Sequence, residues 1–104
     1  MKRVLFSNAA DAALTDIYQF TEGRWGARQA NKYVGELLRV ADQIAAGDVV
    51  PRPIPPEFGV RGCVTRHGNH FVYWRDIDEN TVGVVAILHA SMMQGDRLRD
   101  AFGE

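Results

Sequence analysis

Hydrophobic residues in the second half of the chain follow a pattern that predicts three consecutive strands, over residues 60–67, 70–75 and 81–89. The links between them, Gly68-Asn69 and Asp78-Glu79-Asn80, are short and polar. Such links are typical of turns between antiparallel neighbours. We therefore expect an antiparallel three-stranded meander.

Both faces of this meander are predicted to be apolar. Successive side chains of a strand point to opposite faces, so Val72 and Trp74 share one face while Phe71 and Tyr73 share the other. The third strand continues this alternation, with Val82, Val84, Ala86 and Leu88 on one side and Val85 and Ile87 on the other. A sheet with water on one face alternates apolar with polar residues, so each face of this sheet needs a cover.

Helical periodicity dominates the first half of the chain. Apolar residues recur at 3.6-residue spacing over residues 8–23, where Ser7 or Asn8 can cap the helix, and again between Gly26 and Gly47. Gly23-Arg24-Trp25-Gly26 interrupts the pattern, and Gly47 is placed to end the second helix. Two amphipathic helices joined by a short turn predict an antiparallel hairpin that covers one face of the sheet.

The remaining segments complete an α+β fold. Residues 3–6 predict a short N-terminal strand, residues 48–59 hold all four prolines and predict an extended connector, and residues 96–102 predict a short terminal helix. The predicted architecture is an N-terminal strand and a two-helix antiparallel hairpin packed on a mainly antiparallel sheet that the meander completes. With 104 residues, the chain is expected to form one domain, 1–104.

Composition narrows the function classes. The chain is 46% hydrophobic and 24% charged, and it has neither an apolar run near the roughly 20 residues of a membrane span nor a signal-like start, so we expect a cytoplasmic protein. Its net charge of −1 argues against direct, nonspecific nucleic-acid binding. Cys63 is the single cysteine, and no metal or cofactor motif is present. We expect no cofactor.

A set of short sequences, in a fixed order along the chain, carries a family resemblance. They are Ala12-Ala13-Leu14-Thr15-Asp16-Ile17-Tyr18, Arg24-Trp25-Gly26, Gln29-Ala30-Asn31-Lys32-Tyr33, Arg61, Gly68-Asn69-His70-Phe71-Val72-Tyr73-Trp74-Arg75 and Ile87-Leu88-His89-Ala90-Ser91-Met92. Together they resemble the ParE toxins of bacterial toxin–antitoxin pairs, within the RelE/ParE superfamily. The resemblance implies a RelE/ParE-like fold and a cytoplasmic toxin that inhibits DNA gyrase without catalysis. It also implies a ParD-type antitoxin as partner in a hetero-oligomer, with a heterotetramer as one arrangement.

Relatives on the RelE side of the superfamily instead cut messenger RNA on the ribosome, and fold alone does not choose between the two activities. RelE-like nucleases resemble one another in an arginine at the head of the middle strand and an arginine or histidine with a tyrosine just after the last strand. Here the first position is His70, and no tyrosine follows Tyr73. His70, His89, Arg61 and Arg66 could still surround a phosphate, or the histidines could simply cap strand ends through hydrogen bonds. We interpret the chain as not an enzyme, with a non-toxic antitoxin-binding homologue as a third alternative.

The second face of the sheet is the predicted partner surface. An apolar patch edged by arginines suits an acidic, amphipathic antitoxin segment. The candidate antitoxin-binding residues are Arg61, Arg66, His70, Val72, Trp74, Val85, Ile87, His89 and Met92. The alternative is that the C-terminal segment folds back and completes the core by itself. The candidate target-binding residues are Trp25, Met93, Leu98 and Phe102.

Overall fold

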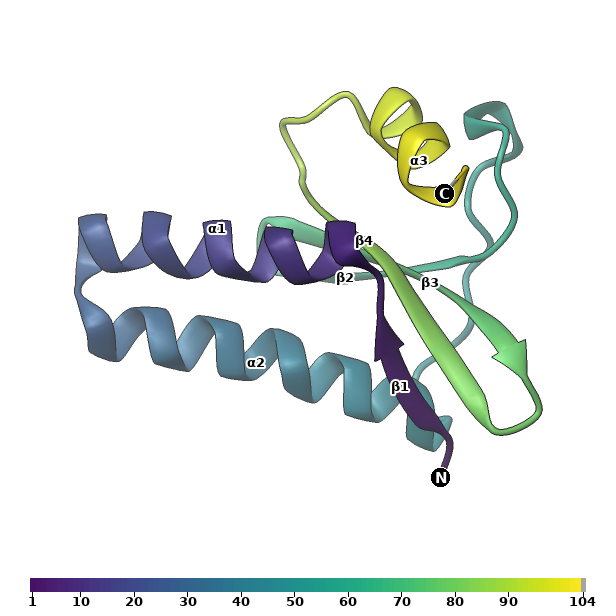
Figure 1. Cartoon of the computed structure of the whole chain (residues 1–104), viewed down its shortest axis with the longest axis horizontal. Coiled ribbons are helices and arrows are strands. Elements are labelled where there is room, and N and C mark those ends of the chain that lie inside the picture. Colours follow the sequence, from purple (N-terminus) through teal and green to yellow (C-terminus); the bar gives the residue numbers. More distant parts are fainter. Residues whose placement is uncertain (104) are drawn as a thin grey trace.

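The computed structural model describes residues 1–103 and has the predicted α+β architecture (Figure 1). A central sheet separates a long helical hairpin from a short C-terminal helix. The elements, in chain order, are β1 (Arg3–Phe6), α1 (Asn8–Trp25), α2 (Ala27–Ala46), the 3₁₀ turn η1 (Pro56–Phe58), β2 (Cys63–His67), β3 (His70–Asp78), β4 (Thr81–His89) and α3 (Gln94–Phe102).

The four strands form one sheet in the order β1-β4-β3-β2. The predicted meander is confirmed: β2 pairs with β3 and β3 with β4, both antiparallel. The N-terminal strand β1 runs parallel to β4, with Arg3 opposite Thr81. This pairing places the start of the chain beside the last strand. β1 and β2 are therefore the edges of the sheet. Within residues 1–103, no helix has the length and apolar character needed to cross a membrane.

The helical hairpin differs from its prediction at the turn between the helices. Helix α1 continues through Gly23, Arg24 and Trp25, and Gly26 alone, with φ +92°, breaks the helical path. Ser7 is the N-cap, because its side chain accepts a hydrogen bond from the Ala10 backbone N–H at 3.0 Å. Gly47 ends α2 in the left-handed conformation, as its position predicts.

The hairpin buries the first face of the sheet. Its contribution to this core includes Ala10 from α1 and Leu37, Ala41 and Ile44 from α2. The sheet contributes Val72, Trp74, Val82, Val84 and Ile87. The tip of the hairpin extends beyond the sheet and carries the Gly26 turn at its end (Figure 1).

The second face of the sheet is covered by the chain itself. Leu98 of α3 is fully buried there, together with Ile54, Tyr73 and Ala86, while Phe102 and Phe58 pack against this cluster. The proline-rich connector pairs with the sheet edge, since the Ile54 N–H donates to the Gly62 carbonyl at 3.0 Å and the Val64 N–H donates to the Arg52 carbonyl at 2.9 Å. β2 begins at Cys63, which pairs with Trp74 of β3, rather than at the predicted residue 60.

A β-bulge in β4 corrects the predicted assignment of faces. Tyr73 pairs with Ala86 and Trp74 with Val84, which leaves Val85 as an extra residue in β4. The alternation is therefore reset at Val85, so that Val84 and Ile87 both face the helical hairpin, while Ala86 lies in the second cluster. The prediction that Ile87 lies opposite Val84 was wrong, because simple alternation cannot include an inserted residue.

Candidate protein-binding surfaces

Four of the candidate antitoxin-binding residues are not on an open surface. Val72, Trp74 and Ile87 pack under the helical hairpin, and Val85 is buried at the bulge. Trp74 is 6% exposed, and its indole N–H donates to the Thr65 hydroxyl at 3.2 Å. The placement of these four side chains on a free sheet face is therefore wrong, because the hairpin covers Val72, Trp74 and Ile87 and Val85 is buried at the bulge.

The C-terminal candidates for target binding include both buried and exposed side chains. Leu98 is fully buried and Phe102 is partly buried in the second cluster, so the alternative in which the C-terminal segment completes the core is confirmed for these two residues. The Arg75 guanidinium lies 5.4 Å from the centre of the Phe102 ring, which holds this end of α3 against the sheet. Met93 and Met92, in contrast, are exposed.

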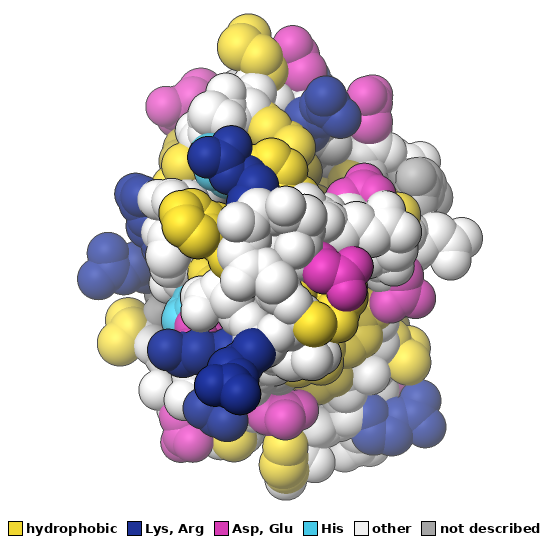
Figure 2. Space-filling view, turned by 90° about the vertical axis from the view of Figure 1, so that its left-hand side faces the viewer, with side chains coloured by type: hydrophobic (Ala, Val, Ile, Leu, Met, Phe, Trp, Pro, Cys, Tyr) yellow, Lys and Arg dark blue, Asp and Glu magenta, His cyan; other side chains and the backbone are white. Residues whose placement is uncertain are grey.

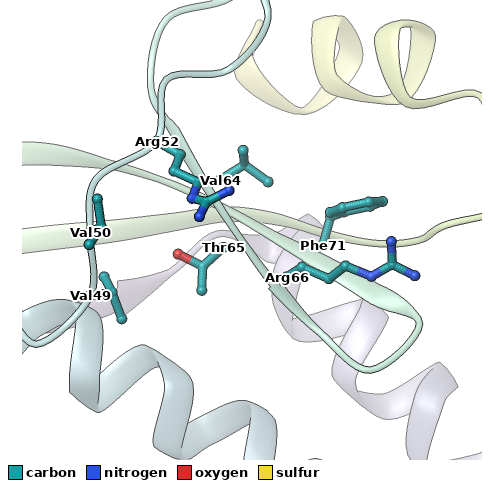
Figure 3. Close-up of a pocket in the computed structure, with 7 residues that line it drawn as sticks. All are labelled: Val49, Val50, Arg52, Val64, Thr65, Arg66 and Phe71. Carbon is teal, nitrogen blue, oxygen red and sulfur yellow. The ribbon is translucent and has the colours of Figure 1, made fainter.

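The exposed edge of β2 carries a cavity. Of the residues that line it, only Arg66 was a binding candidate from the sequence. We call this cavity the β2-edge surface, about 560 Å³ in volume and shown in Figure 3. Its lining residues are Val49, Val50, Arg52, Val64, Thr65, Arg66 and Phe71. The first three come from the connector after α2, where the prolines indicated only an extended path. The pairing of the connector with β2 brings them to the strand edge.

Arg66 is held in position on this surface. Its Nε donates to the Gly68 carbonyl at 3.0 Å, and its guanidinium lies 5.1 Å from the centre of the Phe71 ring. Arg52 lines the same cavity, and the lining set contains no acidic residue in the part of the chain that the structure describes. Arg61, predicted to act with Arg66, instead lines a separate hollow with Arg75 and Phe102. The β2-edge surface is therefore apolar and locally cationic.

The three histidines lie in a row across the ends of β2, β3 and β4. His67 pairs with His70, and His70 with His89. Helix α2 fixes two of them: the Tyr33 hydroxyl lies 2.6 Å from His70 Nδ1, and Glu36 Oε1 lies 3.0 Å from His67 Nε2. Burial, with additional effects of His89 and His67, lowers the pKa of His70 from 6.5 to about 4. His70 is therefore neutral at pH 7.

Tyr33 also anchors the β2–β3 turn. Its hydroxyl donates to the His67 carbonyl at 3.3 Å, and the turn residue Gly68 has φ +57°. A Cβ at position 68 would lie 2.9 Å from the Tyr33 hydroxyl oxygen, which leaves no room for a side chain. Burial raises the pKa of Tyr33 above its usual value of 10. This contact between α2 and the turn keeps His70 in place.

A groove of about 530 Å³, which we call the tip groove, lies between the hairpin tip and the row of histidines. Its apolar walls are Ile17, Phe20, Trp25 and Met92, and its polar lining is Asp16, Thr21, Gln29, Tyr33, Asn69, His70, His89 and Ser91. Trp25 is 67% exposed and Phe20 is 66% exposed, so Trp25 is a surface residue rather than a core plug. Figure 2 looks onto this end of the molecule, where exposed hydrophobic side chains lie among charged ones.

The structure does not bring together the four residues that were considered for phosphate chemistry. His70 and His89 line the tip groove, Arg66 lines the β2-edge surface, and Arg61 lines a third hollow. His89 Nδ1 accepts a hydrogen bond from the Ser91 N–H at 3.1 Å. Within residues 1–103, no cluster of three or more His, Cys, Asp or Glu side chains could hold a metal ion.

Comparison with known proteins identifies the family. Residues 4–94 match the family described as ParE toxin of type II toxin–antitoxin system, parDE. The chain is 36% identical over 93 residues to Toxin ParE1 of Mycobacterium tuberculosis, an alignment that covers 86% of this chain and 91% of that protein. It is 34% identical over 93 residues to Toxin ParE1 of Caulobacter vibrioides, with 88% of this chain and 93% of that protein covered.

A more distant relative and a solved structure agree with this assignment. Toxin ParE of Escherichia coli is 29% identical over 100 residues, with 96% of each chain covered. A chain in the structure described as a chromosomal ParDE TA system from P. aeruginosa superposes with a TM-score of 0.65 at 20% identity, covering 86% of this chain and 96% of that one, and so has the same fold. The chain belongs to the ParE family of toxins from type II toxin–antitoxin systems.

Proposed function

We propose that this ParE-family toxin acts in the cytoplasm and blocks replication by inhibiting DNA gyrase, without a catalytic step of its own. A ParD-type antitoxin neutralises the toxin by binding it directly in a hetero-oligomer. The observation that carries this proposal is the family match over residues 4–94, which includes the helical hairpin and all of the sheet except Arg3, the first residue of β1.

The arrangement of the histidines supports a non-catalytic role. RNA cleavage through the 2′-hydroxyl needs a base, an acid and cationic groups around one phosphate. His70 and His89 use their Nδ1 atoms in contacts with Tyr33 and Ser91. Among the residues that the structure describes, Arg97 is the one cation that lines a hollow together with both histidines. The histidines therefore fit the reading in which they stabilise strand ends, and an endoribonuclease is the less favoured function.

The β2-edge surface is the proposed binding site for the antitoxin. Residues of β2 form the outer edge of the sheet, and the connector pairs with only its first part, through Pro53 opposite Cys63. An extended segment can add to such an edge through backbone hydrogen bonds. Arg52 and Arg66 beside an apolar floor favour a segment that carries acidic and apolar side chains. His70, His89 and Met92, also antitoxin candidates, lie in the tip groove and are not part of this site.

The target is tested by adding the purified toxin to purified gyrase and measuring DNA supercoiling and accumulation of cleaved DNA. We expect inhibition by the toxin alone and recovery when the antitoxin is added. Messenger RNA from growth-arrested cells should remain intact. Ribosome-dependent cleavage of messenger RNA that is lost in His70→Ala or His89→Ala, with gyrase activity unchanged, would contradict the proposal in favour of an endoribonuclease.

The antitoxin site is tested by charge reversal. The double variant Arg52→Glu, Arg66→Glu should bind the antitoxin at least tenfold more weakly, since two charge pairs of about 1 kcal/mol each are replaced by repulsion. Arg39→Glu is the matched control, because Arg39 is exposed on α2 and lines none of the surfaces described above. Arg61→Glu should also have little effect, because Arg61 lies in a different hollow. A loss in Arg39→Glu and in Arg61→Glu about half as large, in free energy, as that in the double variant would follow the change in net charge and contradict a specific site.

A further inference from the structure

One of the two arginines on the β2-edge surface is oriented by a backbone carbonyl. Arg66 is exposed on β2, and its Nε donates to the carbonyl of Gly68, two residues further along the chain, at 3.0 Å. An exposed arginine has many rotamers and loses that freedom when a partner binds it. The bond to Gly68 therefore orients Arg66 before a partner arrives, provided that the Gly68 carbonyl is itself held in place.

Helix α2 holds the first half of the β2–β3 turn, His67-Gly68, from the opposite face of the sheet. Tyr33 packs against the core under the helical hairpin, whereas Arg66 lies over the ring of Phe71, which packs in the second cluster. The Tyr33 hydroxyl donates to the His67 carbonyl at 3.3 Å, and a Cβ at Gly68 would lie only 2.9 Å from the same oxygen. One hydroxyl group thus contacts both residues of this half of the turn.

The second half of the turn has an anchor of its own. The Asn69 carbonyl accepts a hydrogen bond from the Ala90 N–H at 2.8 Å, just after β4. Glu36 also reaches the turn, but its carboxylate contacts the ring of His67 rather than the backbone. Removing the Tyr33 hydroxyl is therefore expected to release the backbone of the first half while the second half stays attached.

We propose that Tyr33 is a positioning residue for antitoxin binding: it holds the first half of the β2–β3 turn, so that the Gly68 carbonyl keeps Arg66 directed along the β2-edge surface. The role in antitoxin binding rests on the proposed function. Arg52 lines the same surface but belongs to the connector, which pairs with β2 before the turn. Tyr33 therefore orients Arg66 and leaves Arg52 unaffected.

The orientation of Arg66 is tested first without a partner. In proton–nitrogen NMR correlation spectra of the toxin, the Arg66 Nε–H signal should shift and exchange faster with water in Tyr33→Phe, because the Gly68 carbonyl is no longer held. Tyr73→Phe is the matched control, since it also removes one hydroxyl, which donates to Gln94 Oε1 at 2.8 Å. The control should leave the Arg66 signal unchanged. An unchanged signal in Tyr33→Phe, or an equal change in both variants, would overturn the proposal.

Antitoxin affinity gives the second test, through a double-mutant cycle. Tyr33→Phe should weaken antitoxin binding about threefold, as expected when one arginine side chain has to be ordered on binding. This loss should disappear in an Arg66→Ala background, where no guanidinium remains to be oriented, and it should persist in an Arg52→Ala background. Tyr73→Phe should leave the affinity unchanged. Equal losses from Tyr33→Phe in the two alanine backgrounds would contradict an effect that passes through Arg66.

The two tests separate this inference from the proposed function. If the antitoxin binds Arg66→Ala and Arg52→Ala as tightly as the unmodified toxin, while the Arg66 signal still responds to Tyr33→Phe, the proposed antitoxin site is wrong and the orientation of Arg66 by Tyr33 stands. If both arginine variants lose affinity but Tyr33 and Arg66 are not coupled in the cycle, the antitoxin site stands and the positioning role is wrong. Thermal unfolding of each variant shows whether it is folded.

Discussion

Replacing Trp74 with alanine tests whether the helical hairpin really covers the first face of the sheet. The indole is 6% exposed, lies in the core formed by α1, α2 and the sheet, and donates a hydrogen bond to Thr65. Truncating a buried tryptophan removes its packing and leaves a cavity, which costs about 3–5 kcal/mol. A domain of this size has a total stability of about 5–15 kcal/mol, so the loss is a large fraction.

The measurement is urea unfolding followed by far-ultraviolet circular dichroism, since the variant lacks one of its two fluorophores. In a thermal scan followed by the same signal, the melting temperature should fall by well over 10 °C, at about 4–8 °C per kcal/mol for a domain near 100 residues. Trp25→Ala is the control, because its exposed ring should contribute within about 0.5 kcal/mol. Equal, small changes in the free energy of unfolding for the two variants would refute the placement of Trp74 in the core.

Three further predictions concern the contacts that hold the second face and the β2–β3 turn. Leu98→Ala should reduce the free energy of unfolding by about 2–5 kcal/mol in a denaturation experiment, because Leu98 anchors α3 in the second cluster; an unchanged value would mean that α3 is not docked in solution. Gly68→Ala should reduce the free energy of unfolding by more than about 1 kcal/mol, since the new Cβ would meet the Tyr33 hydroxyl and the alanine would have to adopt an unfavourable positive φ. Combining it with Tyr33→Phe should recover only the part of this loss that is due to the clash with the hydroxyl oxygen. The free energy of unfolding should also depend on pH through His70, whose pKa is about 4 in the folded chain and about 6.5 in the unfolded chain. The unfolded chain therefore binds the proton more readily. The stabilisation that is present above pH 6.5 is lost as the pH falls toward 4. The full pKa difference corresponds to roughly 3 kcal/mol of unfolding free energy, and we expect a loss of about 1–2 kcal/mol because the His70 ring is only half-buried. This dependence of stability on pH should disappear in His70→Gln. If it persists in that variant, another group causes it.

Local sequence patterns were sufficient to predict the elements of this fold. The outer limits of the helical hairpin followed from Ser7 and Gly47, and the meander followed from the short polar links that separate its strands. The assignment of faces could not be predicted in the same way. The bulge at Val85 depends on pairing between β3 and β4, and no residue type at that position signals an insertion.

The candidate surfaces show the same division between local and long-range information. Arg66 could be singled out from sequence because the only charged residues between Phe58 and Arg75 are arginines, and Trp25 because it is an aromatic residue close to two glycines. Val49, Val50 and Arg52 could not, because their role depends on where the connector pairs with β2, and connectors carry no periodicity. Likewise, Leu98 and Phe102 have the same apolar character whether they face a partner or the core, and only the folded arrangement of α3 distinguishes the two cases.

The Ser7 side chain makes a contact that can form only late in the synthesis of the chain. While it caps α1, the Ser7 hydroxyl also donates to the Val85 carbonyl at 2.6 Å, and the two residues are separated by 78 positions. At a translation rate of roughly 5–20 residues per second, the N-terminal segment waits about 4–16 seconds before its β4 partner is synthesised. Pairing of distant segments is slow compared with formation of local contacts. The nascent chain therefore cannot complete its four-stranded sheet until β4, which lies near the end of the sequence, has been synthesised.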